Sequence, residues 1–245
     1  MHAVGFVLGI PENELDSRLE MFLEDYIDDD SYYIYYDTMD DYDSFEQMAL
    51  DHPDVKTDST KYGRVNPYGQ CDYWSVGGRW EGYFLLKDGT RANSTTIGQI
   101  DFEKMEDDAR ELARKKYRAA LEAINGDKNF KSFEQIRKEY DGVEGDQWKM
   151  ARDAYVQQKP VKDFYAWRRD NDKEMTYFDF NIDDLLKPVS EYEKKVIVNK
   201  MTPCAVIHDD MWEELEVDVD KNLKWLHDLR KREPDLTITM IDYHV

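Results

Sequence analysis

The two ends of the chain carry apolar runs that predict β-strands. Residues 1–10 are apolar on both faces, which is typical of a central strand. Residues 204–208 and 236–245 predict two further strands. Between these two runs, leucines recur at helical spacing over residues 220–232, and Asp220 is the expected N-cap. The late part of the chain therefore predicts a strand, a helix and a strand.

The region after the first strand predicts a helix, a second strand and then irregular chain. Apolar side chains recur at helical spacing over residues 11–26. Residues 31–36 are rich in tyrosine and predict a strand. Residues 37–70 are polar and are interrupted by proline and glycine, so no regular element is expected there.

Gly77-Gly78 predicts the loop of a β-hairpin, because both glycines tolerate the positive φ that a two-residue loop requires. The strands of this hairpin would be residues 72–76 and 79–86. Val76 would then lie opposite Arg79.

The middle of the chain differs from both ends in composition and in periodicity. Residues 101–124 are dense in Ala, Glu, Lys and Arg and predict a long helix. Shorter helical patterns follow at residues 132–140, 146–158, 161–169 and 190–200. We therefore expect a sheet-containing core of residues 1–100 and 201–245, with a mainly helical insertion at residues 101–200.

The order of these elements predicts an α+β fold. A strand, a helix and a strand at each end of the chain suggest a ferredoxin-like split βαβ sheet, to which the predicted hairpin adds strands. In this arrangement the first strand lies between the two late strands and runs antiparallel to both. His2 and His208 would then lie at the same edge of the sheet as His244.

Composition restricts the classes of function. The 245 residues include 54 acidic and 33 basic side chains, for a net charge of -21, and 41% are hydrophobic, enough for a real core. This charge argues against direct binding to nucleic acid or to anionic membrane. No apolar run is long enough to span a bilayer. Two cysteines cannot form a disulfide framework, so a cytoplasmic location is expected.

The negative charge is concentrated near the start of the chain. Residues 11–58 contain 17 acidic and 2 basic side chains, a net charge of -15. Acidic residues flank the tyrosines of the second strand, and a surface of this kind could imitate a phosphate backbone and bind a basic protein. The alternative is a solvated face that keeps the protein soluble. The candidate partner surface consists of Glu24, Asp25, Asp28, Asp29, Asp30, Asp40, Asp41 and Asp43.

The predicted hairpin is also a candidate anion or nucleotide site. Arg79 would supply a planar guanidinium, aromatic side chains would stack a base, and the glycines would let the backbone approach a phosphate. In the alternative, Arg79 stacks on Trp74 and pairs with Glu81 in an ordinary packed hairpin. The candidate ligand-binding residues are Tyr73, Trp74, Gly77, Gly78, Arg79 and Trp80.

Histidines form the third candidate site. Asp242 and His244 share one face of the last strand about 7 Å apart, and His2 and His208 are expected beside them. Such a set could bind a divalent metal, or His244 could act as an acid–base group that Asp242 orients. The alternative is a strand-end histidine whose hydrogen bond to Asp242 holds the terminus. No nucleophile-elbow sequence is present, which disfavours nucleophilic catalysis.

Several motifs resemble a family of uncharacterised phage and prophage proteins. Its members carry an aromatic-x-x-Gly-Gly-Arg-Trp-x-Gly hairpin and a last strand ending in Asp-(Cys or Tyr)-His-(Ile or Val), and residues 74–82 and 242–245 match these patterns. Residues 206–212, Val-Ile-His-Asp-Asp-Met-Trp, are similar to the family as well. The resemblance covers about residue 72 to the end. It implies a phage-related origin and brings neither a reaction nor a cofactor.

These observations favour a non-enzymatic, phage-encoded acidic protein that binds a host factor in the cytoplasm of an infected bacterium, with counter-defence as the expected role. It would act by charge mimicry against a basic host protein or by sequestering a small nucleotide. The alternative is an enzyme on a nucleotide or phosphoester substrate, in which His244 is the acid–base group, Asp242 orients it and Arg79 clamps the anion.

Overall fold

The computed structural model describes residues 1–37, 39–171, 180–215 and 218–245. The chain divides into two compact units, of which one combines Met1–Asp101 with Thr202–Val245 and the other is Phe102–Met201. These bounds lie within one residue of the division expected from the sequence. The elements mix helices and strands, so the predicted α+β class is confirmed.

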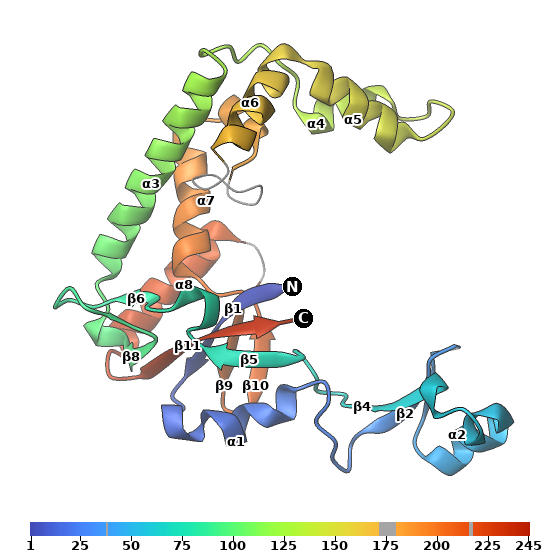
Figure 1. The fold of residues 1–245 in the computed structure, drawn as a ribbon. Helices are drawn as coiled ribbons and strands as arrows, with labels where there is room; N and C mark the ends of the chain where they lie inside the picture. The colour runs from blue at the N-terminus through green and yellow to red at the C-terminus, as the bar shows by residue number, and fades with distance from the viewer. Residues whose placement is uncertain (38, 172–179, 216–217) are drawn as a thin grey trace. The chain divides into compact units, whose positions relative to one another are not determined.

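The first unit is built on a mixed sheet with strand order β10-β9-β1-β11-β5, in which β8 also pairs with β11 (Figure 1). Its strands are β1 (His2–Leu8), β5 (Tyr73–Val76), β8 (Ser94–Thr96), β9 (Ala205–His208), β10 (Met211–Glu214) and β11 (Thr237–His244). β1 is buried from Val4 to Leu8, because it has a strand on each side and helices over its faces. The predicted central strand is therefore confirmed.

Two helical segments accompany this sheet. The first comprises α1 (Leu15–Leu19) and the 3₁₀ turns Glu12–Glu14 and Glu20–Phe22, and it packs on Val7, Ile207 and Ile241. The second is α8 (Val219–Arg232), whose N-cap is Asp218 rather than the predicted Asp220, because the Asp218 carboxylate accepts from the backbone nitrogen of Lys221 at 3.0 Å.

The direction of β9 differs from the prediction. β1 lies between β9 and β11, as expected, and is antiparallel to β11. However, β1 is parallel to β9, with Gly5 opposite Ala205. A parallel pair requires a long crossover connection, and the chain between β1 and β9 supplies one. The expectation that β1 runs antiparallel to both late strands is therefore wrong for β9. A split βαβ unit does occur at β10-α8-β11, with β9 and β1 between its strands.

The tyrosine-rich strand lies outside the main sheet. β2 (Tyr32–Tyr35) is the central strand of a separate sheet with order β3-β2-β4, which also contains β3 (Asp40–Tyr42) and β4 (Tyr62–Val65). α2 (Phe45–Asp51) packs on one face of it, around buried Tyr35 and Met48. Residues 37–70 are thus more ordered than predicted, because these tyrosines form a small core of their own. We call residues 24–66 the acidic module.

The predicted Gly-Gly hairpin is wrong. β5 pairs with β11 instead of with the chain that follows Gly78, and Gly78–Trp80 forms a 3₁₀ turn. Val76 therefore lies opposite Ile241, not opposite Arg79. A hairpin does occur further on, where β6 (Phe84–Leu85) pairs with β7 (Arg91–Ala92).

The second unit is helical, as predicted. Its helices are α3 (Phe102–Ala123), α4 (Phe133–Glu139), α5 (Gln147–Gln157), α6 (Lys159–Asp170) and α7 (Val189–Met201). α6 starts two residues earlier than expected, because Pro160 fits the first turn of a helix. α3 packs along α7, and the core includes Phe164, Phe180 and Tyr192.

Candidate functional site

Two of the predicted site histidines meet where β1 begins and β11 ends. The antiparallel register places His2 directly opposite His244, and their rings lie 4.9 Å apart between centroids in an edge-to-face arrangement. Asp242 lies diagonally across the same pair of strands, and its Oδ1 is 2.8 Å from His2 Nδ1. β5 adds Tyr73 opposite His244. We call His2, Asp72, Tyr73, Asp242 and His244 the histidine edge.

Asp242 is the buried anion of this site, with 2% of its surface exposed. Because a carboxylate only accepts hydrogen bonds, His2 Nδ1 is the donor to Oδ1. Its other oxygen accepts from the backbone nitrogen of Arg79 at 3.0 Å. A buried carboxylate requires such partners, and here β1 and the turn after β5 supply them.

The Gly77-Gly78 turn is shaped around this carboxylate. The two glycines have φ values of +78° and +50°, and a Cβ on Gly78 would lie 2.5 Å from the Asp242 carboxylate oxygen. Glycine is therefore required for close approach, as the sequence predicted, but the anion that approaches belongs to the protein itself. The Asp242 carboxylate lies where a phosphate would have to approach the turn.

The residues predicted to bind a ligand at this turn therefore lie in different environments and do not form one site. Tyr73 belongs to the histidine edge, and Trp74 packs into the core beside Cys71 and Tyr243. The Arg79 side chain is exposed and Trp80 is half-buried. Arg79 contributes to the site through its backbone nitrogen. The structure therefore does not support a nucleotide cradle at Gly77-Gly78.

Asp72 is a member of the site that sequence reasoning missed. Its Oδ2 is 2.8 Å from His244 Nδ1, and this hydrogen bond holds the pKa of the Asp72 carboxyl below its ordinary value. The prediction that Asp242 orients His244 is thus wrong, because His244 pairs with Asp72 and Asp242 pairs with His2. The available signal was a carboxylate directly before an aromatic strand, β5, which begins at this edge.

Tyr73 connects the two carboxylate–histidine pairs. Its ring stacks on His244 with centroids 5.5 Å apart and an angle of 13° between planes. Its hydroxyl is 3.0 Å from His2 Nε2. Because Nδ1 of His2 faces Asp242, Nε2 on the other side of the ring is the atom that meets the Tyr73 hydroxyl. Asp242, His2 and Tyr73 therefore form a continuous hydrogen-bond chain from a buried carboxylate to an exposed phenol.

His208 lies at the other end of the sheet. Because β9 is parallel to β1, His208 is level with Leu8, six residues from His2 and therefore about 20 Å away along the strands. The predicted metal set of His2, His208, Asp242 and His244 is not assembled. Within the described ranges, no group of three or more His, Cys, Asp or Glu side chains could hold a metal ion.

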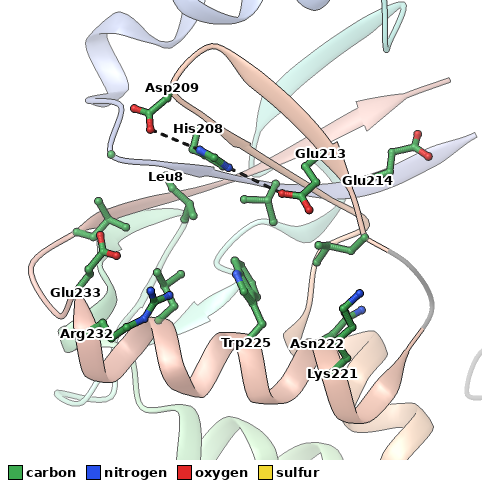
Figure 2. A pocket seen from close by; sticks show the side chains of 15 residues that line it. Leu8, His208, Asp209, Glu213, Glu214, Lys221, Asn222, Trp225, Arg232 and Glu233 are labelled. Atoms are coloured by element: carbon green, nitrogen blue, oxygen red, sulfur yellow. Dashed lines mark ion pairs between the residues drawn. The ribbon is translucent and has the colours of Figure 1, made fainter.

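His208 instead lines a cavity of about 670 Å³ between α8 and the sheet (Figure 2). Its ring nitrogens lie 3.6 Å from Asp209 Oδ2 and 4.0 Å from Glu213 Oε2. Trp225 projects from α8 toward these side chains. Carboxylates beside an indole ring suit a cationic group, although Lys221 and Arg232 also line the cavity.

The predicted partner surface lies on the acidic module. Seven of its eight residues are exposed, whereas Asp28 is half-buried and accepts from the Ser31 hydroxyl at 3.1 Å. The face of the small sheet opposite α2 carries Tyr32, Ile34 and Val65, because Tyr33 and Tyr35 point into the α2 core. Asp41 lies opposite Ile34, so at least one exposed carboxylate shares this partly exposed apolar sheet face.

Specific contacts order both the core and the outer face of the acidic module. The Tyr35 hydroxyl donates to Asp54 Oδ2 at 2.8 Å and, together with Lys61, lowers the pKa of the Asp54 carboxyl. Tyr36 crosses the outer face, where a Cβ on Gly63 would lie 2.0 Å from its hydroxyl, and 53% of Tyr36 remains exposed. The module therefore presents an ordered surface with an exposed aromatic ring.

Comparisons with known proteins give no match to this chain among family models, curated proteins or solved structures. The described helices include none that is both long and apolar enough to cross a membrane.

Proposed function

We propose that the chain is an acidic binding protein whose acidic module docks on a basic surface of a partner protein. The observation that carries this proposal is the partly exposed face of the β3-β2-β4 sheet, which holds Tyr32, Ile34 and Val65 together with the exposed carboxylate of Asp41, in a module rich in exposed acidic residues. An aromatic and aliphatic centre with a charged rim is the usual anatomy of a protein interface.

The distribution of charge between the two units supports this proposal. The helical unit, residues 102–201, contains 22 acidic and 21 basic side chains and is almost neutral. Nearly all of the net charge of -21 therefore lies in the first unit, and -15 of it in residues 11–58. General solubility would be served equally well by charge spread over both units, whereas a concentrated field accelerates association with a basic partner.

The partner would be a protein that normally binds nucleic acid. The carboxylates of Asp29, Asp30, Asp41 and Asp43 would occupy the positions of phosphates in its basic groove, and Tyr36 would pack beside them. In keeping with the resemblance to phage proteins, this partner would be a host factor, and its occupation would serve counter-defence.

The test compares capture of partners from bacterial lysate by the wild-type chain and by a variant with Asp29→Asn, Asp30→Asn, Asp41→Asn and Asp43→Asn. A matched control carries four equal charge changes in the helical unit, at Asp141, Glu144, Asp153 and Glu122, which are also exposed. We expect one basic protein to be retained by wild type and control, released by salt, and lost from the module variant.

The captured protein is then purified and its affinity measured with all three chains. Salt-sensitive binding that the module variant loses, and competition by duplex DNA for the same partner, would support the proposal. Equal binding by the module variant and the control would refute it, as would a partner that DNA does not displace.

A second candidate function follows from the Asp242–His2–Tyr73 hydrogen-bond chain. A buried carboxylate that holds a histidine, which in turn contacts a hydroxyl, can support acid–base chemistry on a phosphoester substrate. His244, half-exposed beside Tyr73, would exchange the proton with the substrate, and the exposed Arg79 would contact the anion.

This second candidate is tested with chromogenic phosphomonoester and phosphodiester substrates. Turnover by wild type that falls about 100-fold or more in His244→Gln, with the fold retained, would support it. An inactive wild type, or a His244→Gln variant with unchanged turnover, would exclude it without affecting the binding proposal.

A further inference from the structure

The helical unit contains a cavity of about 1100 Å³ between α6 and the α4–α5 pair. All of its lining residues belong to this unit, so it is independent of the acidic module and of the histidine edge. Its size is ample for a nucleotide-sized ligand. The side chains that determine its chemistry are Trp148, Arg152, Lys162, Tyr165, Arg168 and Arg169.

Helical spacing directs these residues into one space. On α5, Trp148 and Arg152 are four residues apart and therefore lie on one face. On α6, Lys162, Tyr165 and Arg169 follow at intervals of three and four residues and form a second stripe. Both stripes line the same cavity, so an aromatic ring and cationic groups face it from each helix.

Positively charged side chains line this cavity, although the protein as a whole is negatively charged. Among the described residues that line it, Arg152, Lys162 and Arg169 are exposed cations, and the carboxylate of Asp163 is paired with Lys159 on the same helix. Three exposed cations that face one cavity in a chain of net charge -21 favour an anionic ligand. Arginine is suited to this role because its guanidinium binds phosphate oxygens in a bidentate manner.

The aromatic side chains supply a place for a planar base. Trp148 is 56% exposed although it is a large apolar side chain. The guanidinium carbon of Arg152 lies 5.6 Å from the centroid of a Trp148 ring, and Phe133 contacts the indole edge-on. An exposed indole next to a cation is the combination with which proteins stack nucleobases while they hold the attached phosphate.

The wall behind these residues is fixed by hydrogen bonds. The hydroxyl of buried Tyr155 donates to Asp183 Oδ1 at 2.7 Å, and the backbone nitrogen of Phe133 donates to Asp183 Oδ2 at 2.9 Å. Asp183 therefore ties the start of α4 to the last turn of α5. Preorganisation of this kind lowers the entropy cost of binding.

We propose that this cavity binds a nucleotide, with the phosphates against Arg152, Lys162 and Arg169 and the base on Trp148. The nucleotide site that the sequence suggested at Arg79 would then lie in the helical unit instead. The inference does not depend on the acidic module, so either can fail alone.

The first test is calorimetric titration of the full chain with ATP, GTP, CTP and UTP. The variant Arg152→Gln/Arg169→Gln removes two cations, and the control Arg137→Gln/Lys149→Gln removes two cations from α4 and α5 that do not line the cavity. We expect at least one nucleotide to bind wild type and control equally, and to bind the cavity variant at least tenfold more weakly.

Three further arms test the proposed roles within the cavity. Adenosine and tripolyphosphate separately should each bind more weakly than ATP, and Trp148→Ala should weaken ATP without changing tripolyphosphate. An azido-nucleotide photolabel should mark the tryptic peptides of α5 and α6 in the wild-type chain, which requires no variant to fold.

Absence of binding by all four nucleotides at about 1 mM would overturn the proposal. So would labelling confined to peptides outside α5 and α6, or equal affinity of the cavity variant and the control. Tripolyphosphate that binds as tightly as ATP would overturn the role of Trp148 as the base platform and with it the assignment to nucleotides.

Discussion

The carboxylate of Asp242 accepts a hydrogen bond from the backbone nitrogen of Arg79 at 3.0 Å, although 163 residues separate the two. This contact explains the Gly77-Gly78 turn, the burial of an anion at the end of β11 and the position of His2. It ties the chain after β5 to the last strand of the protein. Substitutions in the Gly77-Gly78 turn or at Asp242 should therefore lower the free energy of unfolding.

Gly78→Ala should destabilise the fold strongly. Its φ is +50°, and the new Cβ would lie 2.5 Å from both the Cβ and the carboxylate of buried Asp242, so strain and overpacking add. We expect a loss of about 3 kcal/mol or more in the free energy of unfolding, measured by urea denaturation.

Gly89→Ala is the matched control for this change. Gly89 also has a positive φ, +85°, but no described atom lies within 4 Å of the position of its Cβ. The expected loss is therefore about 1 kcal/mol, from the backbone conformation alone. Equal losses at Gly78 and Gly89 would contradict the proposed close approach of Asp242.

The two carboxylate–histidine pairs should contribute unequally to stability. Asp242→Ala leaves the Arg79 backbone nitrogen and His2 Nδ1 without their buried acceptor, and we expect a loss of about 3 kcal/mol. Asp72→Ala removes the partner of His244 at an exposed position and should have a much smaller effect. Comparison of the two urea midpoints checks this order, and a larger loss from Asp72→Ala would contradict it.

The pKa of Asp72 should depend on His244. The hydrogen bond from His244 lowers the carboxyl pKa in the folded state, so its stabilising contribution is present above the ordinary pKa near 3.8 and is lost as the pH falls through the lowered value. Carboxyl carbon shifts followed by NMR should show a rise in the Asp72 pKa in His244→Ala. The pKa of Asp88, which Thr90 lowers, should stay unchanged and serves as the control.

The two thiols should differ in reactivity. Burial raises the pKa of the Cys71 thiol to about 11, so it is protonated and shielded at neutral pH, whereas Cys204 is exposed. A thiol reagent should therefore modify Cys204 alone in the folded protein and both cysteines in urea. Rapid modification of Cys71 in a folded Cys204→Ser variant would show that the environment of Cys71 differs from the one described.

The sequence alone determined those elements whose pattern is local. The periodicity of α3, the apolar character of β1 and the alternation in β11 each identified an element, because helix and strand periods are properties of consecutive residues. The change in composition near residues 101 and 201 likewise located the two units. His2, Asp242 and His244 were placed together correctly, since β1 and β11 are adjacent and antiparallel.

Only the tertiary structure decided the direction of β9 and the role of the glycine turn. The direction of a strand depends on the path of the chain before it, and almost 200 residues connect β1 to β9, so no local pattern placed His208. Gly77-Gly78 had the sequence of a hairpin loop. In the structure, however, β11 is the strand that pairs with β5, and its Asp242 is the anion that the turn approaches. Backbone hydrogen bonds are satisfied by whichever segment the whole fold brings near, and for β5 that segment is β11, at the far end of the chain.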